Sequence, residues 1–373
     1  MTERKGLKKI VRERMEQTGE AYTTAHRQVA RRRPPAGGLG HRPSALVRYL
    51  LAEAGRPLSE PMVCGLGGGI GFLYAVFEYK AVPHPLLTIV AQHHPQPWAP
   101  TVLDHLNVPY TEQHSSSTPA ALKKLRACLD TGRPALCSVD RGSLPWHETG
   151  MFDSPADPFP VVVAGIEGDS VLVLDRGEDP RPLSVDEFGA AWSAHRKGRH
   201  ALLSIDPSVG PAPDLASAAA KAVGLTTAHL TGPVLGHAFD VNMGLRGMTK
   251  LAAELRDRRG RTGWANRFGS GVAFAHAMRR LDECLQLEYT APDATRPIYA
   301  DFLDEVAPLL PALDLRGAAD LIRESGRHWS GITTAARSGG EGDRTALFDT
   351  LADHVEAAVD AESTAVRLLG GNT

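Results

Sequence analysis

The sequence predicts an α+β domain followed by a mainly α-helical domain, and two observations lead to this prediction. Short apolar runs at residues 86–91, 135–139, 159–165 and 171–174 have the length and composition of β-strands and alternate with helical stretches. Beyond residue 215 no such run follows, and apolar residues recur at helical spacing up to residue 369.

The elements of the first domain are predicted one by one from their end signals. A helix is expected over residues 43–54, because Pro43 suits a first helical turn and Gly55 ends the pattern. Further helices are expected at residues 99–105, 120–129 and 185–194. A short polar connection with Gly168 joins the runs 159–165 and 171–174, which indicates a hairpin. Helices beside an antiparallel sheet give the α+β class.

Composition bounds the class of protein. The chain has 373 residues, of which 42% are hydrophobic and 23% charged, as in globular proteins. No apolar run approaches the roughly 20 residues that span a bilayer, and the N-terminus has no apolar signal core, so we expect a cytoplasmic protein without membrane contact. The four cysteines lack metal-site spacing, and we expect free thiols, no metal and no cofactor.

Charge and proline content suggest three segments. Residues 1–33 carry ten Lys or Arg and four Glu, and residues 1–35 are expected to form a basic helical extension and linker. Residues 4–33 could contact nucleic acid or a protein, or could be a solvated helical extension. Prolines at 207, 211 and 213 mark a second boundary, which gives domains at 36–208 and 209–373.

Two groups of motifs carry a resemblance to a known family. The first is the segment from Leu58 to Tyr74, with its glycines at 65, 67, 68, 69 and 71, followed by Leu174-Asp175-Arg176-Gly177 and Leu183–Trp192. The second is Arg296-Pro297-Ile298-Tyr299 with Trp329. Together they resemble the butirosin biosynthesis protein H family and its usual helical domain. The resemblance implies a papain-like fold and a role in specialised metabolism. It also implies an acyltransferase activity that moves an acyl group from a carrier thioester to a small amine.

The chemistry implied by the family needs three groups. A thiolate is held at a helix N-terminus, an imidazole on a facing strand exchanges the proton, and an Asp orients the imidazole. In this sequence Arg42 stands at the expected Cys position, Phe159 at the expected His position and Asp175 at the orienting position. A guanidinium stays protonated and cannot be a nucleophile.

Two interpretations remain open. In the first, a displaced catalytic set of Cys64, His147 and Asp175 acts, with the substrate held by residues that surround it: His41, Arg42, Gly67, Gly68, Gly69 and Tyr74. In the second, the module is inactive and binds an anionic metabolite or an acyl carrier protein near Arg42. Cys64 could equally be a buried thiol, His147 a loop residue, His41 a helix-start residue and the glycines a packing device.

Overall fold

The computed structural model describes residues 40–79, 84–95, 97–147, 158–176, 179–194, 199–206, 213–269, 271–339 and 343–371. Residues 40–373 form one compact unit, and only this unit is described below. The extension predicted for residues 1–35 lies outside the described residues. The boundaries predicted at 36–208 and 209–373 stay predictions.

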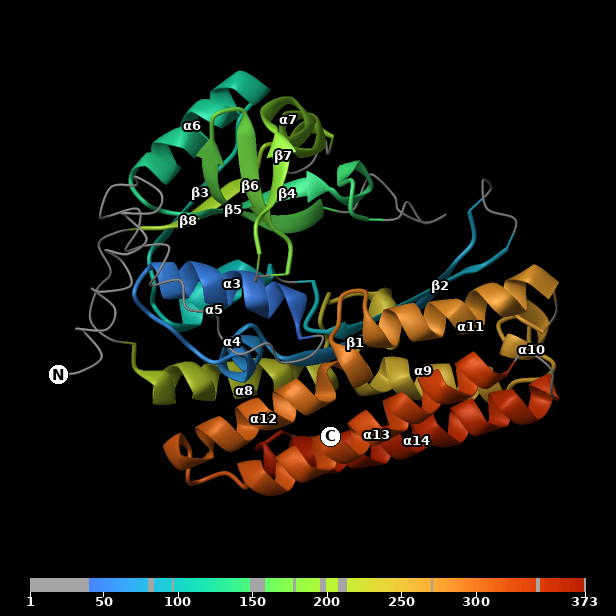
Figure 1. The fold of residues 1–373 in the computed structure, drawn as a ribbon. Helices are drawn as coiled ribbons and strands as arrows, with labels where there is room; N and C mark the ends of the chain where they lie inside the picture. The colour runs from blue at the N-terminus through green and yellow to red at the C-terminus, as the bar shows by residue number, and fades with distance from the viewer. Residues whose placement is uncertain are drawn as a thin grey trace. The chain divides into compact units, whose positions relative to one another are not determined.

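A six-stranded antiparallel sheet forms the upper layer in Figure 1, with strand order β3-β8-β4-β5-β6-β7. Its strands follow in chain order: β3 (Tyr110–Gln113), β4 (Ala135–Asp140), β5 (Pro158–Glu167), β6 (Ser170–Leu174), β7 (Arg181–Ser184) and β8 (Leu202–Ile205). β5 and β6 make the predicted hairpin, with Val162 opposite Leu174 and Glu167 opposite Ser170. This register places Asp175 directly after β6, where that strand leaves the sheet.

Helices cover both faces of this sheet (Figure 1). Strand β4 shows why: Cys137 and Val139 point to one face and Leu136 to the other, as strand alternation requires. The first face packs on α6 (Thr118–Asp130) and α7 (Val185–Ser193). The second packs on α3 (Arg42–Glu53), with α4 (Glu60–Leu66) and α5 (Trp98–His105) beside it.

A second, two-stranded sheet lies against the helical part of the chain. Strand β1 (Ile70–Phe77) pairs antiparallel with β2 (Leu86–Gln92). Side chains from helices cap the free edge of β2: Arg280 Nε donates to the Leu87 carbonyl at 3.3 Å, and Arg296 Nη1 donates to the Ala91 carbonyl at 2.7 Å. The backbone of Ile89, between them, hydrogen-bonds to the Cys284 sulfur. The edge that could recruit another strand is therefore covered within the chain.

The C-terminal part of the unit is helical, as predicted, with short 3₁₀ turns at Ala238–Asn242, Pro292–Thr295 and Ala307–Leu309. Its helices are α8 (Leu215–Thr231), α9 (Gly244–Arg256), α10 (Trp264–Arg267), α11 (Gly271–Gln286), α12 (Arg296–Val306), α13 (Leu315–Ser338) and α14 (Arg344–Leu368). Figure 1 shows α13 and α14 side by side. No helix in the described part of the chain is both long and apolar enough to span a lipid bilayer.

A fully buried ion pair joins these helices to the two-stranded sheet of β1 and β2. Arg296 and Glu362 are both 0% exposed, and Arg296 Nε lies 2.8 Å from Glu362 Oε1. The same guanidinium donates to the Gly71 carbonyl at 3.2 Å. Tyr299 and Trp329 are completely buried and pack the core. The α+β class with a following helical region is therefore confirmed.

Candidate functional site

The candidate site is built where the N-terminus of α3 meets β5 and the end of β6. Arg42 is the first residue of α3 and directly follows His41, which is buried. Phe159 lies on β5, and Asp175 follows β6. The helix start, the facing strand and the acid therefore meet as the resemblance implies.

Arg42 closes this site with its own side chain. Its Nε donates to Asp175 Oδ1 at 2.7 Å, and its Nη2 donates to the Pro160 carbonyl. The guanidinium carbon lies 3.5 Å from the centroid of the Phe159 ring. A planar cation on an aromatic face is a favourable contact when it is partly desolvated. The cation and ring thus fill the space that a thiol and an imidazole would share.

Asp175 accepts hydrogen bonds from three side chains. Besides Arg42, it accepts from Trp146 Nε1 at 3.1 Å and from His147 Nε2 at 2.8 Å. Burial raises the pKa of Asp175, but the hydrogen bond from His147 and the charge of Arg42 outweigh burial and hold this pKa well below its usual range. Asp175 is therefore a carboxylate at all physiological pH values.

Arg42 remains a cation. Burial lowers its pKa to about 10, while the neighbouring charge of Asp175 acts in the opposite direction. At neutral pH the guanidinium is protonated and carries no lone pair for nucleophilic attack. His147 stands with its ring edge toward Phe159, at 5.0 Å between centroids. The structure thus brings together Arg42, His147 and Asp175 among the residues predicted for the site.

Cys64 takes no part in this cluster. It lies in α4, is 0% exposed, and burial raises the pKa of its thiol far above the usual range. Its hydrogen-bond partner is Ser44, whose hydroxyl lies 2.6 Å from His41 Nδ1. A buried, protonated thiol is a poor nucleophile.

His41 belongs to the same buried network. Its Nε2 lies 2.6 Å from Gln92 Oε1, and the side chain is 0% exposed. Burial lowers the pKa of His41 to about 4, despite the hydrogen bond to Gln92, so the ring is neutral at pH 7. His41, Ser44 and Cys64 therefore form a closed polar chain inside the core.

The backbone amides of the glycine segment, residues 67–69, are also hydrogen-bonded within the fold. The amide of Gly67 donates to the Val63 carbonyl, that of Gly68 to Gly65 and that of Gly69 to Cys64. A methyl group on Gly67 would lie 2.3 Å from the Trp98 ring, and one on Gly69 would lie 2.2 Å from the Tyr299 ring. The amides are used within the fold, and the missing side chains allow close packing.

Tyr74 lies in the helical core instead of near the site. Its hydroxyl donates to Glu254 Oε2 at 2.6 Å and accepts from Trp264 Nε1 at 3.0 Å. Two partners of the site, Trp146 and the Pro160 carbonyl, were not predicted. Trp146 could have been suspected because it directly precedes His147 in the sequence, whereas nothing in the sequence marks a carbonyl group. Among the described residues, no cluster of three or more His, Cys, Asp or Glu could hold a metal ion.

Comparison with known proteins adds the family. Residues 41–176 match the family model of Butirosin biosynthesis protein H, N-terminal, and residues 191–369 match a Domain of unknown function (DUF4872). No curated protein matches the chain. A solved structure, a putative C39-like peptidase from Bacillus anthracis, is 13% identical, with 46% of this chain and 90% of that chain covered and a TM-score of 0.31. With its two domain matches in sequence order, the chain belongs to the butirosin biosynthesis protein H-like family.

Proposed function

We propose that this protein is a catalytically silent, papain-like module of specialised metabolism that binds an anionic ligand in the cytoplasm. One observation carries the proposal: Arg42 occupies the helix start where the family chemistry needs a thiol, and it is held there by Asp175 and Phe159. The acid that would orient a catalytic imidazole instead neutralises this guanidinium.

The charge around the site supports an anionic ligand. Arg141 lies 5.6 Å from the centroid of the Phe159 ring, and Arg181 lies 5.3 Å from that of Trp146. Arg181 and Arg176 are exposed. Guanidinium groups bind phosphate and carboxylate oxygens in a bidentate manner. The phosphate of a carrier protein's phosphopantetheine arm, or a small carboxylate metabolite, suits this rim.

Restoring the missing groups tests whether the site is silent for the stated reason. In the double variant Arg42→Cys/Phe159→His, a thiol at the start of α3 would again face an imidazole beside Asp175. We expect iodoacetamide to label position 42 rapidly in this variant and more slowly in Arg42→Cys alone, as read by peptide mass spectrometry. The wild-type protein, whose four cysteines are all buried, should show no fast adduct. Fast labelling of wild-type Cys64, or turnover of an acyl thioester by the wild type, would contradict the proposal.

Binding is tested separately by calorimetry with phosphopantetheine. We expect Arg181→Gln to weaken this binding several-fold, while Arg126→Gln, an exposed arginine on α6, leaves it unchanged. Equal affinity of both variants would place the anion elsewhere.

A second candidate function is direct acyl transfer, and the 2.8 Å contact between His147 and Asp175 favours it. Here His147 would take a proton from an acceptor amine as the amine nitrogen attacks the carbonyl of an acyl thioester. The new C–N bond forms, the C–S bond breaks, and the proton passes to the leaving thiolate, so no protein thiol is needed. Release of free thiol from acetyl-pantetheine in the presence of an amine would support this function, provided that His147→Gln abolishes it.

A further inference from the structure

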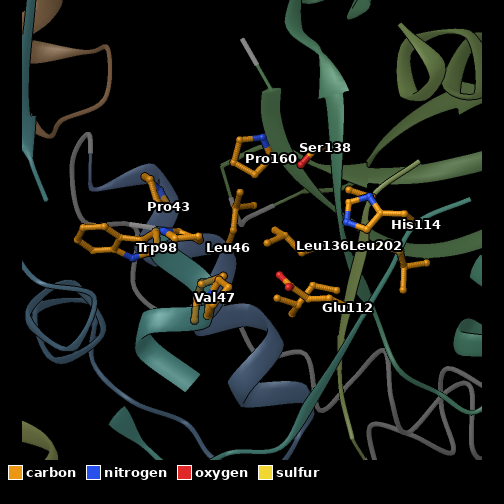
Figure 2. A pocket seen from close by; sticks show the side chains of 15 residues that line it. Pro43, Leu46, Val47, Trp98, Glu112, His114, Leu136, Ser138, Pro160 and Leu202 are labelled. Carbon is orange, nitrogen blue, oxygen red and sulfur yellow. The ribbon is translucent and has the colours of Figure 1, made fainter. Parts of the chain in front are cut away.

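A pocket of about 250 Å³ opens between α3 and the sheet, beside the candidate site. Figure 2 shows it from close by. Pro43 and Pro160, which line one end, directly follow Arg42 and Phe159 in the sequence. The pocket itself contains none of the groups that contact Asp175.

The walls of the pocket are apolar for a reason that follows from the fold. Leu46 and Val47 come from the buried face of α3, and Leu136 and Leu203 come from the face of the sheet that packs on this helix. Ser138 stands on the same face of β4, two residues after Leu136, where an apolar side chain would fill the gap. Trp98, the first residue of α5, borders the opposite side (Figure 2).

One acidic side chain breaks this apolar pattern. Glu112 lies on the edge strand β3, directly opposite Leu203 of β8, and paired residues share a face of the sheet. It therefore points to the same face as the apolar side chains, and Figure 2 shows its carboxylate turned into the pocket. Within residues 40–371, as far as the structure describes them, no Lys, Arg or His forms an ion pair with Glu112. His114, two residues further along, lines the pocket next to it.

We infer that this pocket binds an apolar amine. An exposed carboxylate at the mouth of a mostly apolar cavity selects a ligand with a hydrocarbon body and one cationic end, because a hydrocarbon alone leaves the charge unused and an anion would be repelled. A volume of about 250 Å³ holds on the order of eight non-hydrogen atoms at roughly 30 Å³ each. The ammonium pairs with Glu112, and the body packs against Leu46, Leu136 and Leu203. This site is independent of the anionic ligand proposed above.

Hexylamine, hexanol and hexanoate test the inference, since they share one hydrocarbon chain and differ in the charge of the end group. Calorimetry on the wild-type chain should rank hexylamine first and hexanoate last. The variant Glu112→Gln should lose roughly two- to fivefold in affinity for hexylamine, as expected for an exposed ion pair, while its affinity for hexanol stays unchanged. The matched control is Glu167→Gln, an exposed glutamate at the far end of β5, which should leave all three affinities unchanged.

A second variant keeps the test decisive if Glu112→Gln perturbs the fold. Ser138→Phe places a ring inside the pocket and should abolish binding of hexylamine and hexanol alike, with an unchanged circular dichroism spectrum. The inference is overturned if hexanoate binds as tightly as hexylamine, or if Ser138→Phe folds and still binds hexylamine. It is also overturned if no hexylamine binds, in which case Glu112 only protects the edge strand from pairing with other chains.

Discussion

The guanidinium carbon of Arg42 lies 3.5 Å from the centroid of the Phe159 ring, at the two positions where the resemblance implies a thiol and an imidazole. The two replacements are complementary, because a cation needs a counter-charge and a surface to lie on. Asp175 supplies the first and the phenyl ring supplies the second. Arg42, Phe159 and Asp175 thus form a structural contact.

Arg42→Met should destabilise the protein by about 3 kcal/mol, because Asp175 then loses its charged partner in a largely buried place. Arg42 is 14% exposed and Asp175 is 6% exposed. Urea unfolding measures the change, and Arg126→Met on the exposed face of α6 provides the control. A loss no larger than that of the control would mean that His147 and Trp146 alone satisfy the acid.

Stability should fall as the pH falls from 6.5 to 4. Burial lowers the pKa of His41 from 6.5 to about 4, and it lowers the pKa values of His229 and His276 in the same way. The unfolded chain therefore binds more protons than the folded chain in this window, and the stabilisation is complete above pH 6.5 and lost below. For His41 the loss amounts to about 3 kcal/mol.

Urea unfolding at pH 7 and pH 5 measures this dependence. The variant His41→Asn should show a smaller difference between the two pH values, whereas His114→Asn, which replaces an exposed histidine, should not. Asp175 does not contribute to the difference between pH 7 and pH 5. Its pKa is lowered in the folded chain, so its stabilisation is lost only when the pH falls below its pKa in the unfolded chain, about 3.9. Equal pH dependence in the wild type and His41→Asn would contradict the buried neutral state of this ring.

Gly69→Ala should cost about 3 kcal/mol or more, and Gly168→Ala should cost only about 1 kcal/mol. Both glycines have a positive φ, of 58° and 60°, so the backbone strain is matched. A methyl group on Gly69 would meet Tyr299, whereas nothing lies within 4 Å of one on Gly168. Thermal unfolding of the two variants separates packing from strain, and similar losses would show that Tyr299 moves aside freely.

Arg296→Met should destabilise the chain by about 4 kcal/mol, because it leaves the Glu362 carboxylate buried without a counter-charge. Replacing both residues, in Arg296→Met/Glu362→Leu, should recover much of the loss, since no buried charge then remains. A double-mutant cycle by urea unfolding measures the coupling between them. Additive losses would indicate that the bonds from Arg296 to the Gly71 and Ala91 carbonyls matter more than the ion pair.

Much of the fold could be predicted, and the errors have physical causes. The long helices and the β5–β6 hairpin follow from periodicity and turn residues. Strands β3, β7 and β8 were not predicted, because each has only four residues and depends on its neighbours in the sheet. Strand β1 was missed since it begins inside the glycine segment and is nearly continuous in apolar residues, which carries no alternation.

The site shows the same division. Arg42, Phe159 and Asp175 were identified from the resemblance, and the contact between His147 and Asp175 fits the residues chosen for the displaced site. Cys64 is fully buried, and its hydrogen-bond partner Ser44 comes from another helix, α3. Such contacts are set by tertiary packing, and a local sequence pattern carries no record of them.

The capped edge of β2 has a practical consequence for anyone who divides the chain. Arg280, Cys284 and Arg296, which satisfy its backbone, all lie beyond residue 209. A fragment that stops there would keep the β1–β2 sheet but leave backbone carbonyl groups of β2 without their hydrogen-bond donors. It would also expose the apolar side chains of Phe72 and Ile89. We expect such a fragment to self-associate through that strand, so the two family segments are best produced as one polypeptide.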